Sequence, residues 1–360
     1  MRMTWAVTYG LQQPGRIKTH LIMNLFFFKN IFMAIAILAV SINTVSCSKD
    51  PIEPIDETRN KLHEDPAKMT IQLVECHLHA DWNEIQQVGG PHQNPESPAK
   101  YLKRVQEMSY ELKAGKGWEL SAGSQPKFYV QKNGEYTIGK KFTPAPVYLM
   151  FINYYNSKGE LMNNQFVENG QEIIHQHFFT PTAVRPTFDG KAETDDNAPQ
   201  KIIDYLYADT TPWNKTKHGG SAEITGDDNP LGFKGVIRFL RDRKEFNLKI
   251  RLYHGYASKI NPQTGKHDPF FKPSGTLIQR GTWDINIDIP VVVYRDREDV
   301  VEVGEDQDVT LIPENSLDPA SNRTIQSIMH AFNISWSEAL QDFQKYTYQA
   351  GDTESGGIWL

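Results

Sequence analysis

Strict alternation of apolar and polar residues is the feature that most constrains the fold of this chain. Residues 246–252 alternate in this way, with Phe246, Leu248, Ile250 and Leu252 all at one parity. Successive side chains of a β-strand point to opposite faces, so this period predicts a strand with one face in a core. Residues 282–294 repeat the pattern. The chain is therefore expected to be built mainly of sheets.

Further strands are predicted from about Met69 onward, separated by turn signals at the spacing typical of a β-sandwich or barrel. A polar stretch without periodicity, residues 188–199, divides these strands into two blocks. The predicted fold class is mainly β, with two β-sandwich-like domains in tandem, one inserted helix and a short C-terminal helical tail. The expected parts are a leader and lipoprotein signal peptide (1–46), a tether (47–66), a β-rich domain (67–187), a second β-rich domain (188–300), and an acidic linker with the helical tail (301–360).

Helical periodicity is confined to two places. Residues 97–112 begin with a serine and Pro98, which suit the first turn of a helix, and then carry apolar residues at helical spacing. They predict the inserted helix. Residues 322–349 predict two short helices joined near Asn333, and Ser335 with Glu338 has the form of a capping box.

The N-terminal residues predict export. A start at Met23 is followed by a short lysine-bearing stretch, an apolar run over residues 31–40, and small residues before Cys47. This order is typical of a secretory signal peptide and is too short for a stable membrane span. Residues 44–47 resemble the bacterial lipobox, in which the cysteine is lipidated, although Thr44 replaces the usual aliphatic residue. We expect Cys47 to anchor an outer-membrane lipoprotein in the cell envelope, on its periplasmic or outer side.

Composition and cysteine count indicate a packed core without disulfides and a protein that does not bind nucleic acid. Hydrophobic residues make up 39% and aromatic residues 11% of the chain, which supports a packed core. The net charge of -6 offers no basic surface, so nucleic acid is not expected as a partner. With Cys47 lipidated, Cys76 is the one thiol left of the two cysteines, and no internal disulfide is expected. Cys76 lies at the apolar parity of its strand and is expected to be buried.

Two pairs of histidines spaced one residue apart are the main candidates for chemistry. They are His77 with His79 and His175 with His177, each in a predicted strand. Alternate residues of a strand face the same way, so each pair points two imidazoles in one direction. Imidazole nitrogens suit zinc or copper. If the two strands meet, the four histidines predict a metal site, whereas a single pair on an exposed strand face is more often structural.

Carboxylates and a further histidine flank these pairs. Glu75 and Asp81 share the parity of His77 and His79, which makes them candidates for ligands or for groups that orient the rings. Glu84 is a further candidate ligand, and His92, in a turn-rich stretch, is a candidate that could cover the site, although an exposed loop position is the simpler interpretation of His92. Haem, which needs two opposed axial histidines over an apolar slot, is the less favoured cofactor.

A family resemblance adds to the prediction of compartment. The sequence phrases at residues 90–98, 165–171, 175–179 and 229–235 are similar to those of a family of Bacteroidetes-type secreted lipoproteins. The resemblance extends over most of residues 70–295. It implies no particular activity, but such lipoproteins often act as accessories to outer-membrane receptors that import metals, haem or glycans. The resemblance therefore implies two partners. One is the membrane, to which a lipid anchors the protein, and the other is an outer-membrane receptor.

Two other functions remain open on the sequence. A glycan-binding or adhesion lipoprotein without a working metal would use exposed aromatic residues, for which Tyr154, Tyr155, Trp213 and Trp283 are candidates. A cupin-like metalloenzyme would use His77, His79 and Glu84, but the glycine expected ahead of the pair and a second motif are missing. Other catalytic signatures, such as a nucleophile elbow or a phosphate loop, are absent. The sequence therefore predicts a binding protein and not an enzyme.

Overall fold

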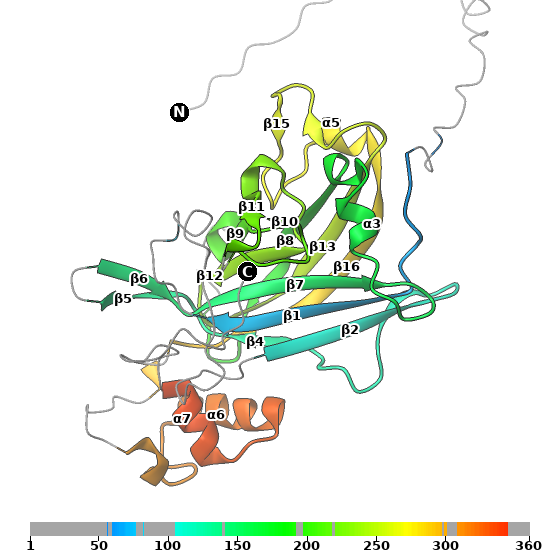
Figure 1. Cartoon of the computed structure of the whole chain (residues 1–360). Coiled ribbons are helices and arrows are strands. Elements are labelled where there is room, and N and C mark those ends of the chain that lie inside the picture. The colour runs from blue at the N-terminus through cyan, green and yellow to red at the C-terminus, as the bar shows by residue number, and fades with distance from the viewer. Residues whose placement is uncertain are drawn as a thin grey trace, which may run out of the picture. The chain divides into compact units, whose positions relative to one another are not determined.

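Two large sheets form the body of the protein (Figure 1). The structure is a computed structural model that describes residues 56, 60–76, 82, 105–138, 141–191, 197–217, 220–296, 299–300 and 308–344. The described residues from 60 onward belong to one compact unit, Glu57–Leu360. The mainly β class predicted from the sequence is confirmed.

The larger sheet has six strands in the order β3-β2-β1-β7-β12-β9, and every neighbouring pair is antiparallel. In chain order the strands are β1 (Lys68–Cys76), β2 (Val105–Lys113), β3 (Gly117–Leu120), β7 (Val147–Tyr155), β9 (Ile203–Tyr207) and β12 (Lys234–Phe239).

The second sheet has four strands in the order β4-β16-β13-β8, antiparallel except for the parallel pair of β4 and β16. In chain order these are β4 (Phe128–Val130), β8 (His175–Pro186), β13 (Lys244–Gly255) and β16 (Gly281–Val293).

Small elements complete the fold. The two-stranded sheets pair β5 (Gly134–Ile138) with β6 (Lys141–Ala145), β10 (Thr210–Thr211) with β11 (Glu223–Ile224), and β14 (Ile260–Asn261) with β15 (Lys266–His267). The helices are α3 (Asn164–Val167), α4 (Pro199–Ile202), α5 (Gly275–Ile278), α6 (Pro319–Phe332) and α7 (Trp336–Gln344), with the 3-10 turns η2 (Gln171–Ile173), η4 (Gly226–Asp228) and η6 (Val309–Leu311).

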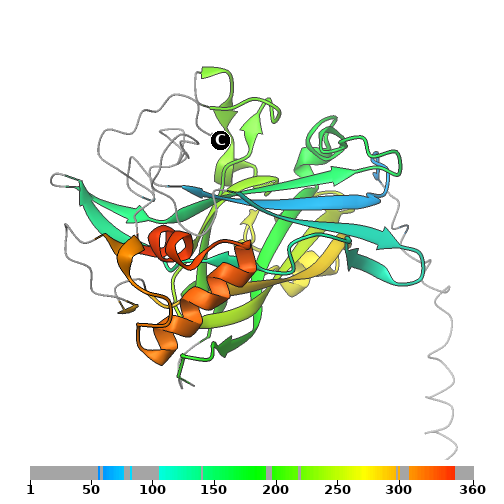
Figure 2. The same ribbon diagram turned by 90° about the horizontal axis from the view of Figure 1, so that it is seen from below.

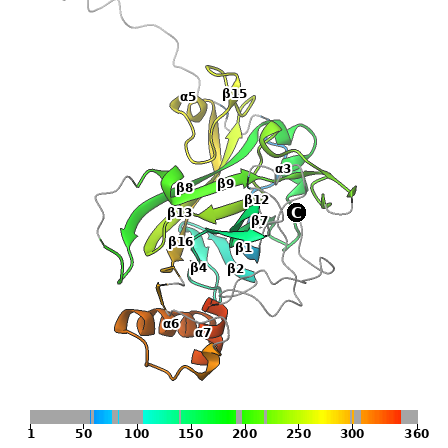
Figure 3. The same ribbon diagram turned by 90° about the vertical axis from the view of Figure 1, so that its left-hand side faces the viewer.

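The main core lies between the two large sheets, which face each other (Figure 3). One buried cluster joins Ile71 and Leu73 of β1 to Ile250 and Leu252 of β13. The inward parity predicted for residues 246–252 is therefore confirmed. Each of these side chains is at most 1% exposed, so the core contributes the hydrophobic free energy that holds the sheets together.

The strand pairing differs from the expected tandem arrangement of domains 67–187 and 188–300. Each large sheet contains strands of both predicted blocks, because β7 of the first block pairs with β12 of the second, and β8 of the first block pairs with β13 of the second. The polar stretch after residue 187 is thus a connection within one sandwich-like unit. Periodicity reports which face of a strand is buried but not which strand lies beside it, so this pairing was not available from the sequence.

The inserted helix predicted over residues 97–112 is corrected by the structure. Residues 105–113 form β2, while residues 97–104 lie outside the described part of the chain. Met108 and Tyr110 are buried on one face of this strand, whereas Val105 and Leu112 are more than 40% exposed. The apolar residues of this segment fit the helical period and the strand period equally well. The segment forms a strand because it pairs with β1 and buries one face there.

The C-terminal helical tail is confirmed in the residues described. Asn333 adopts a left-handed conformation and ends α6, and α7 begins three residues later and lies beside α6 (Figure 2). Ile325, Ile328 and Leu340 belong to the buried cluster that the two helices share. The capping box is formed, since the amide of Ser335 donates to Glu338 at 2.8 Å.

Asp209 organises the segment that leads into β12. Its carboxylate is buried and accepts hydrogen bonds from the four successive backbone amides of residues 231–234, at 2.6 to 3.2 Å. Since β12 pairs with both β7 and β9, this carboxylate holds in place the backbone at the start of a strand that lies inside the sheet.

Asp209→Asn should therefore lower the free energy of unfolding by about 2–3 kcal/mol, because an amide nitrogen would face backbone donors in a buried site. Urea denaturation followed by circular dichroism measures the change. The matched control is Asp204→Asn, which weakens a partly exposed ion pair with Arg238 and should cost less than about 1 kcal/mol. Equal losses in the two variants would contradict the assigned role of Asp209.

Candidate metal centre

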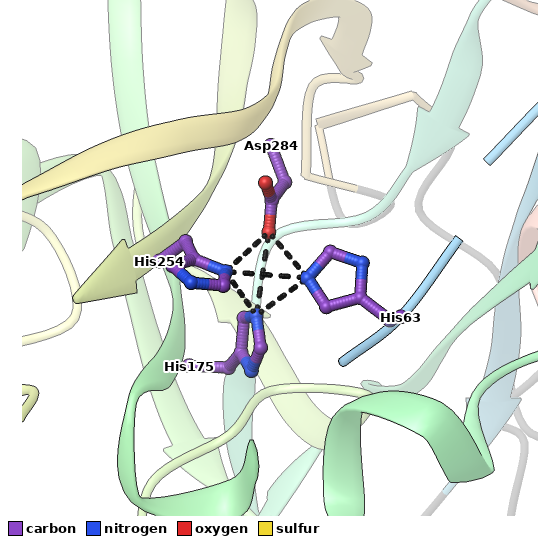
Figure 4. A group of neighbouring side chains, drawn as sticks. All are labelled: His63, His175, His254 and Asp284. Carbon is purple, nitrogen blue, oxygen red and sulfur yellow. Dashed lines mark hydrogen bonds and ion pairs between the residues drawn. The ribbon is translucent and has the colours of Figure 1, made fainter. Parts of the chain in front are cut away.

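Three histidines and one aspartate converge at one edge of the core (Figure 4). His175 begins β8, His254 lies near the end of β13, and Asp284 lies in β16. His63 comes from the stretch of chain that precedes β1. All four side chains are nearly inaccessible to solvent, with at most 4% exposure.

The two strand histidines are placed by backbone pairing. His254 lies directly opposite His175 in the antiparallel ladder of β13 and β8. His254 also has the inward parity of Leu252, so both rings point from the second sheet toward the core. Directly opposed residues have Cβ atoms about 4.5–5.5 Å apart, which is a suitable separation for two ligands of one ion.

A β-bulge brings Asp284 to the same place. In the ladder of β13 and β16, Tyr253 pairs with Trp283 and Leu252 pairs with Ile285, so that Asp284 has no partner residue on β13. Strict alternation would turn Asp284 away from the face of Ile285. The extra residue of a bulge changes the direction of a side chain, and here it directs the carboxylate toward the two histidines.

The four facing atoms form a nearly regular tetrahedron. They are Nε2 of His63, Nε2 of His175, Nδ1 of His254 and Oδ2 of Asp284, and all six distances between them lie from 3.0 to 3.3 Å. The centre of a regular tetrahedron with this edge lies about 2.0 Å from each corner, which matches the Zn–N and Zn–O bond lengths of about 2.0–2.2 Å.

Hydrogen bonds on the far sides of the rings fix which nitrogens carry protons. Nδ1 of His63 lies 2.9 Å from the carbonyl oxygen of Glu64, and Nδ1 of His175 lies 2.8 Å from that of Gln171. A carbonyl only accepts, so each Nδ1 donates, and a ring that is protonated at Nδ1 alone turns the lone pair of Nε2 inward. Such backbone contacts are the usual means of orienting metal-binding histidines.

The electrostatics of the cluster also suit a cation. Burial lowers the pKa of His175 to about 4, so this ring is neutral at pH 7. Burial opposes ionisation of Asp284, but the surrounding rings of His175, His254 and His63 lower its pKa well below the ordinary value. A protonated ring nitrogen accounts for this lowering, and the same inward nitrogens, once deprotonated, offer lone pairs that lie 3.2–3.3 Å from the carboxylate. Oδ2 of Asp284 and Nε2 of His254 have no hydrogen-bond partner among the described residues. A positive ion at the centre would relieve the repulsion between the facing acceptors.

Phe166 supplies an apolar wall on one side of the cluster. Its ring centroid lies 4.2 Å from that of His63 and 5.2 Å from that of His175. Phe166 is fully buried, so it limits the access of water to the two rings. Taken together, the residues present could hold a divalent transition metal ion in a closed, four-coordinate site.

Of the two predicted histidine pairs, the structure describes only the second. His175 belongs to the cluster, but His177 does not, although both face the core. Nε2 of His177 lies 2.7 Å from the hydroxyl of Tyr154, and its Nδ1 lies 2.8 Å from the carbonyl oxygen of Leu231. Both ring nitrogens of His177 are therefore engaged in structural hydrogen bonds.

The other predicted ligands fall into two groups. Glu75 is fully buried on the parity of Leu73, not on an outward face, and it is not a member of the cluster. Cys76 is buried as expected, and burial raises the pKa of its thiol. The remaining candidates lie outside the described residues: His77, His79, Asp81, Glu84, His92 and the proposed lipidation site Cys47.

Sequence reasoning missed His63, His254 and Asp284. The inward parity of His254 was a usable signal, since it places a histidine beside a core strand. His63 falls in residues 47–66, which were expected to be a tether, yet residues 60–66 are hydrogen-bonded to α3 and η2. The position of Asp284 depends on the bulge, for which the sequence carries no clear mark.

Two of the aromatic residues considered for glycan binding are packed against other parts of the protein. Tyr154 is fully buried, and Trp283 lies under the guanidinium of Arg251, 4.7 Å from its ring centroid. These contacts assign both rings to packing.

Comparisons with family models, curated proteins and solved structures found no match. The resemblance to a lipoprotein family therefore stays a prediction. Within the described part of the chain, no helix is both long and apolar enough to cross a membrane.

A buried lysine lies close to the start of β8. The amide of Lys259 donates to the carbonyl of Ile173, and its Nζ donates to the carbonyl of Pro230 at 2.8 Å. Burial lowers the pKa of Lys259 to about 7, against the opposing influence of Asp209 and Glu172. Between pH 7 and about 10.5 the unfolded chain therefore binds a proton at this residue that the folded chain has lost.

The stability of the wild-type protein relative to Lys259→Met should consequently rise with pH above 7, by up to about 1.4 kcal/mol per pH unit. Denaturant titrations of both proteins from pH 7 to 9.5 measure the difference. The variant also loses one hydrogen bond, but that loss is independent of pH and leaves the slope intact. Parallel stability curves would show that Lys259 keeps an ordinary pKa.

Proposed function

We propose that this protein binds one divalent transition metal ion through His63, His175, His254 and Asp284. The tetrahedral arrangement of their facing atoms is the observation that supports the proposal. Four protein ligands leave no open position, which is typical of sites that hold a metal and not of catalytic sites. The proposed activity is therefore metal binding without catalysis.

Zinc is the metal that this geometry favours. Copper(II) prefers square-planar or tetragonal ligand sets, whereas zinc accepts three imidazoles and a carboxylate in a tetrahedron. Haem would need two opposed histidines, and the rings here converge on a point. The sequence supports placing the site on a lipoprotein that is anchored at Cys47 in the cell envelope, as an accessory to metal uptake across the outer membrane.

Elemental mass spectrometry of the protein, purified without a histidine tag, should find about one zinc ion per chain, as a single four-ligand site requires. His175→Ala and His254→Ala should each reduce bound zinc to a small fraction, because each removes a donor that the second sheet holds in place. His330→Ala, which removes an exposed histidine of α6, is the matched control and should retain the metal. A metal-free wild type that takes up no added zinc would disprove the proposal.

The predicted histidine pairs provide a second, independent test. His177→Gln should keep its zinc, since both ring nitrogens of His177 are engaged elsewhere. The double variant with His77→Ala and His79→Ala should also keep its zinc if the four-residue cluster is the site. Loss of zinc from that double variant would move the site to the first pair.

A further inference from the structure

The four proposed ligands are held in two different ways. His175, His254 and Asp284 lie on three adjacent strands, β8, β13 and β16, joined by continuous ladders of backbone hydrogen bonds. His63 lies in the N-terminal strap, which we define as residues 60–66. Among the described residues, backbone pairing of this part of the chain begins at Ala67, whose amide donates to Tyr155.

The N-terminal strap is attached to the rest of the protein mainly through side chains. Gln165 accepts a hydrogen bond from the amide of Glu64 at 2.8 Å. Gln171 donates to the carbonyl of Asn60 at 2.9 Å, and the side chain of Asn60 donates to the carbonyl of Tyr256 at 2.5 Å. These bonds lie on both sides of His63 and hold its ring against the cluster.

This difference determines which ligand can leave. Withdrawing His175 or His254 requires opening rungs of the second sheet, with the core residues beside them. Apart from the bond to the metal, which any leaving ligand must break, withdrawing His63 requires the loss of a few side-chain hydrogen bonds, of the ion pair between Lys61 and Asp284, and of the contact with Phe166. Local opening follows the weakest set of contacts, so the strap should open far more often than the sheet.

We propose that the N-terminal strap is the gate of the metal site and that His63 is its exchangeable ligand, an inference that rests on the proposed metal binding. Metal enters and leaves when the strap opens. In the open state His175, His254 and Asp284 retain the ion as a set of two histidines and one carboxylate, which leaves a coordination position open. That position takes a monodentate Lewis base, such as the imidazole nitrogen of another molecule.

The first test weakens the strap without touching a ligand. The double variant Asn60→Gly and Gln165→Ala removes two attachments, and glycine tolerates the positive φ of 63° at residue 60. Zinc stoichiometry should be unchanged, while the rate of zinc release to a chelator should rise about fivefold or more. Hydrogen exchange of residues 60–66 should quicken in parallel. Gln72→Ala, which removes a hydrogen bond to Glu107 elsewhere, is the matched control and should release zinc at the wild-type rate.

The outcomes separate the two proposals. Zinc bound at wild-type stoichiometry but released at the wild-type rate, despite faster exchange in the strap, would overturn the gate and leave the metal site standing. A wild-type protein that binds no zinc would overturn both.

A second variant tests the three-ligand state. His63→Ala should still bind Co²⁺ at saturating concentration, with lower affinity, and added imidazole should restore the intense visible absorption of tetrahedral cobalt. Absence of Co²⁺ binding, or a spectrum that imidazole leaves unchanged, would overturn the assignment of His63 as the exchangeable ligand.

Discussion

The backbone ladder that joins β8, β13 and β16 is the constraint on which the rest of the structure depends. It closes one side of the core and sets His254 opposite His175. The same ladder contains the bulge that turns Asp284 inward. Since polar groups buried together without partners are costly, this edge of the core is a place where a bound cation would convert an unfavourable cluster into a stabilising one.

Local features of the fold followed from the sequence, and long-range pairing did not. The inward face of β13 and the capping box at Ser335 depend on residues within a few positions of each other, so periodicity and spacing were sufficient. The pairing of β7 with β12, and of β13 with β8, depends on contacts between segments that are distant in the sequence. The stretch that became β2 shows the limit even of local reasoning, because its apolar residues satisfied a helical and a strand period alike.

The candidate site was predictable to a similar extent. The spacing of His175 and His177 identified a strand that presents two rings to one side, and that is where one ligand lies. What separates the two histidines is their partners, since both are fully buried. The ring nitrogens of His177 contact the Tyr154 hydroxyl and the Leu231 carbonyl, whereas His175 faces His63, His254 and Asp284. No pattern in the sequence identifies those partners.

The origin of His63 bears on what kind of metal protein this chain can be. A site built wholly on one sheet would be rigid, and its fourth ligand could leave only with part of the core. In the proposed site the fourth ligand comes from a segment with side-chain attachments, so the closed tetrahedral form and the open three-ligand form differ by the bond of His63 to the metal, a few hydrogen bonds and one ion pair. Tight retention and ready transfer of a metal are normally opposed demands. A ligand on a strap allows both, because the rate of release is then set by the stability of the strap and not by that of the sheet.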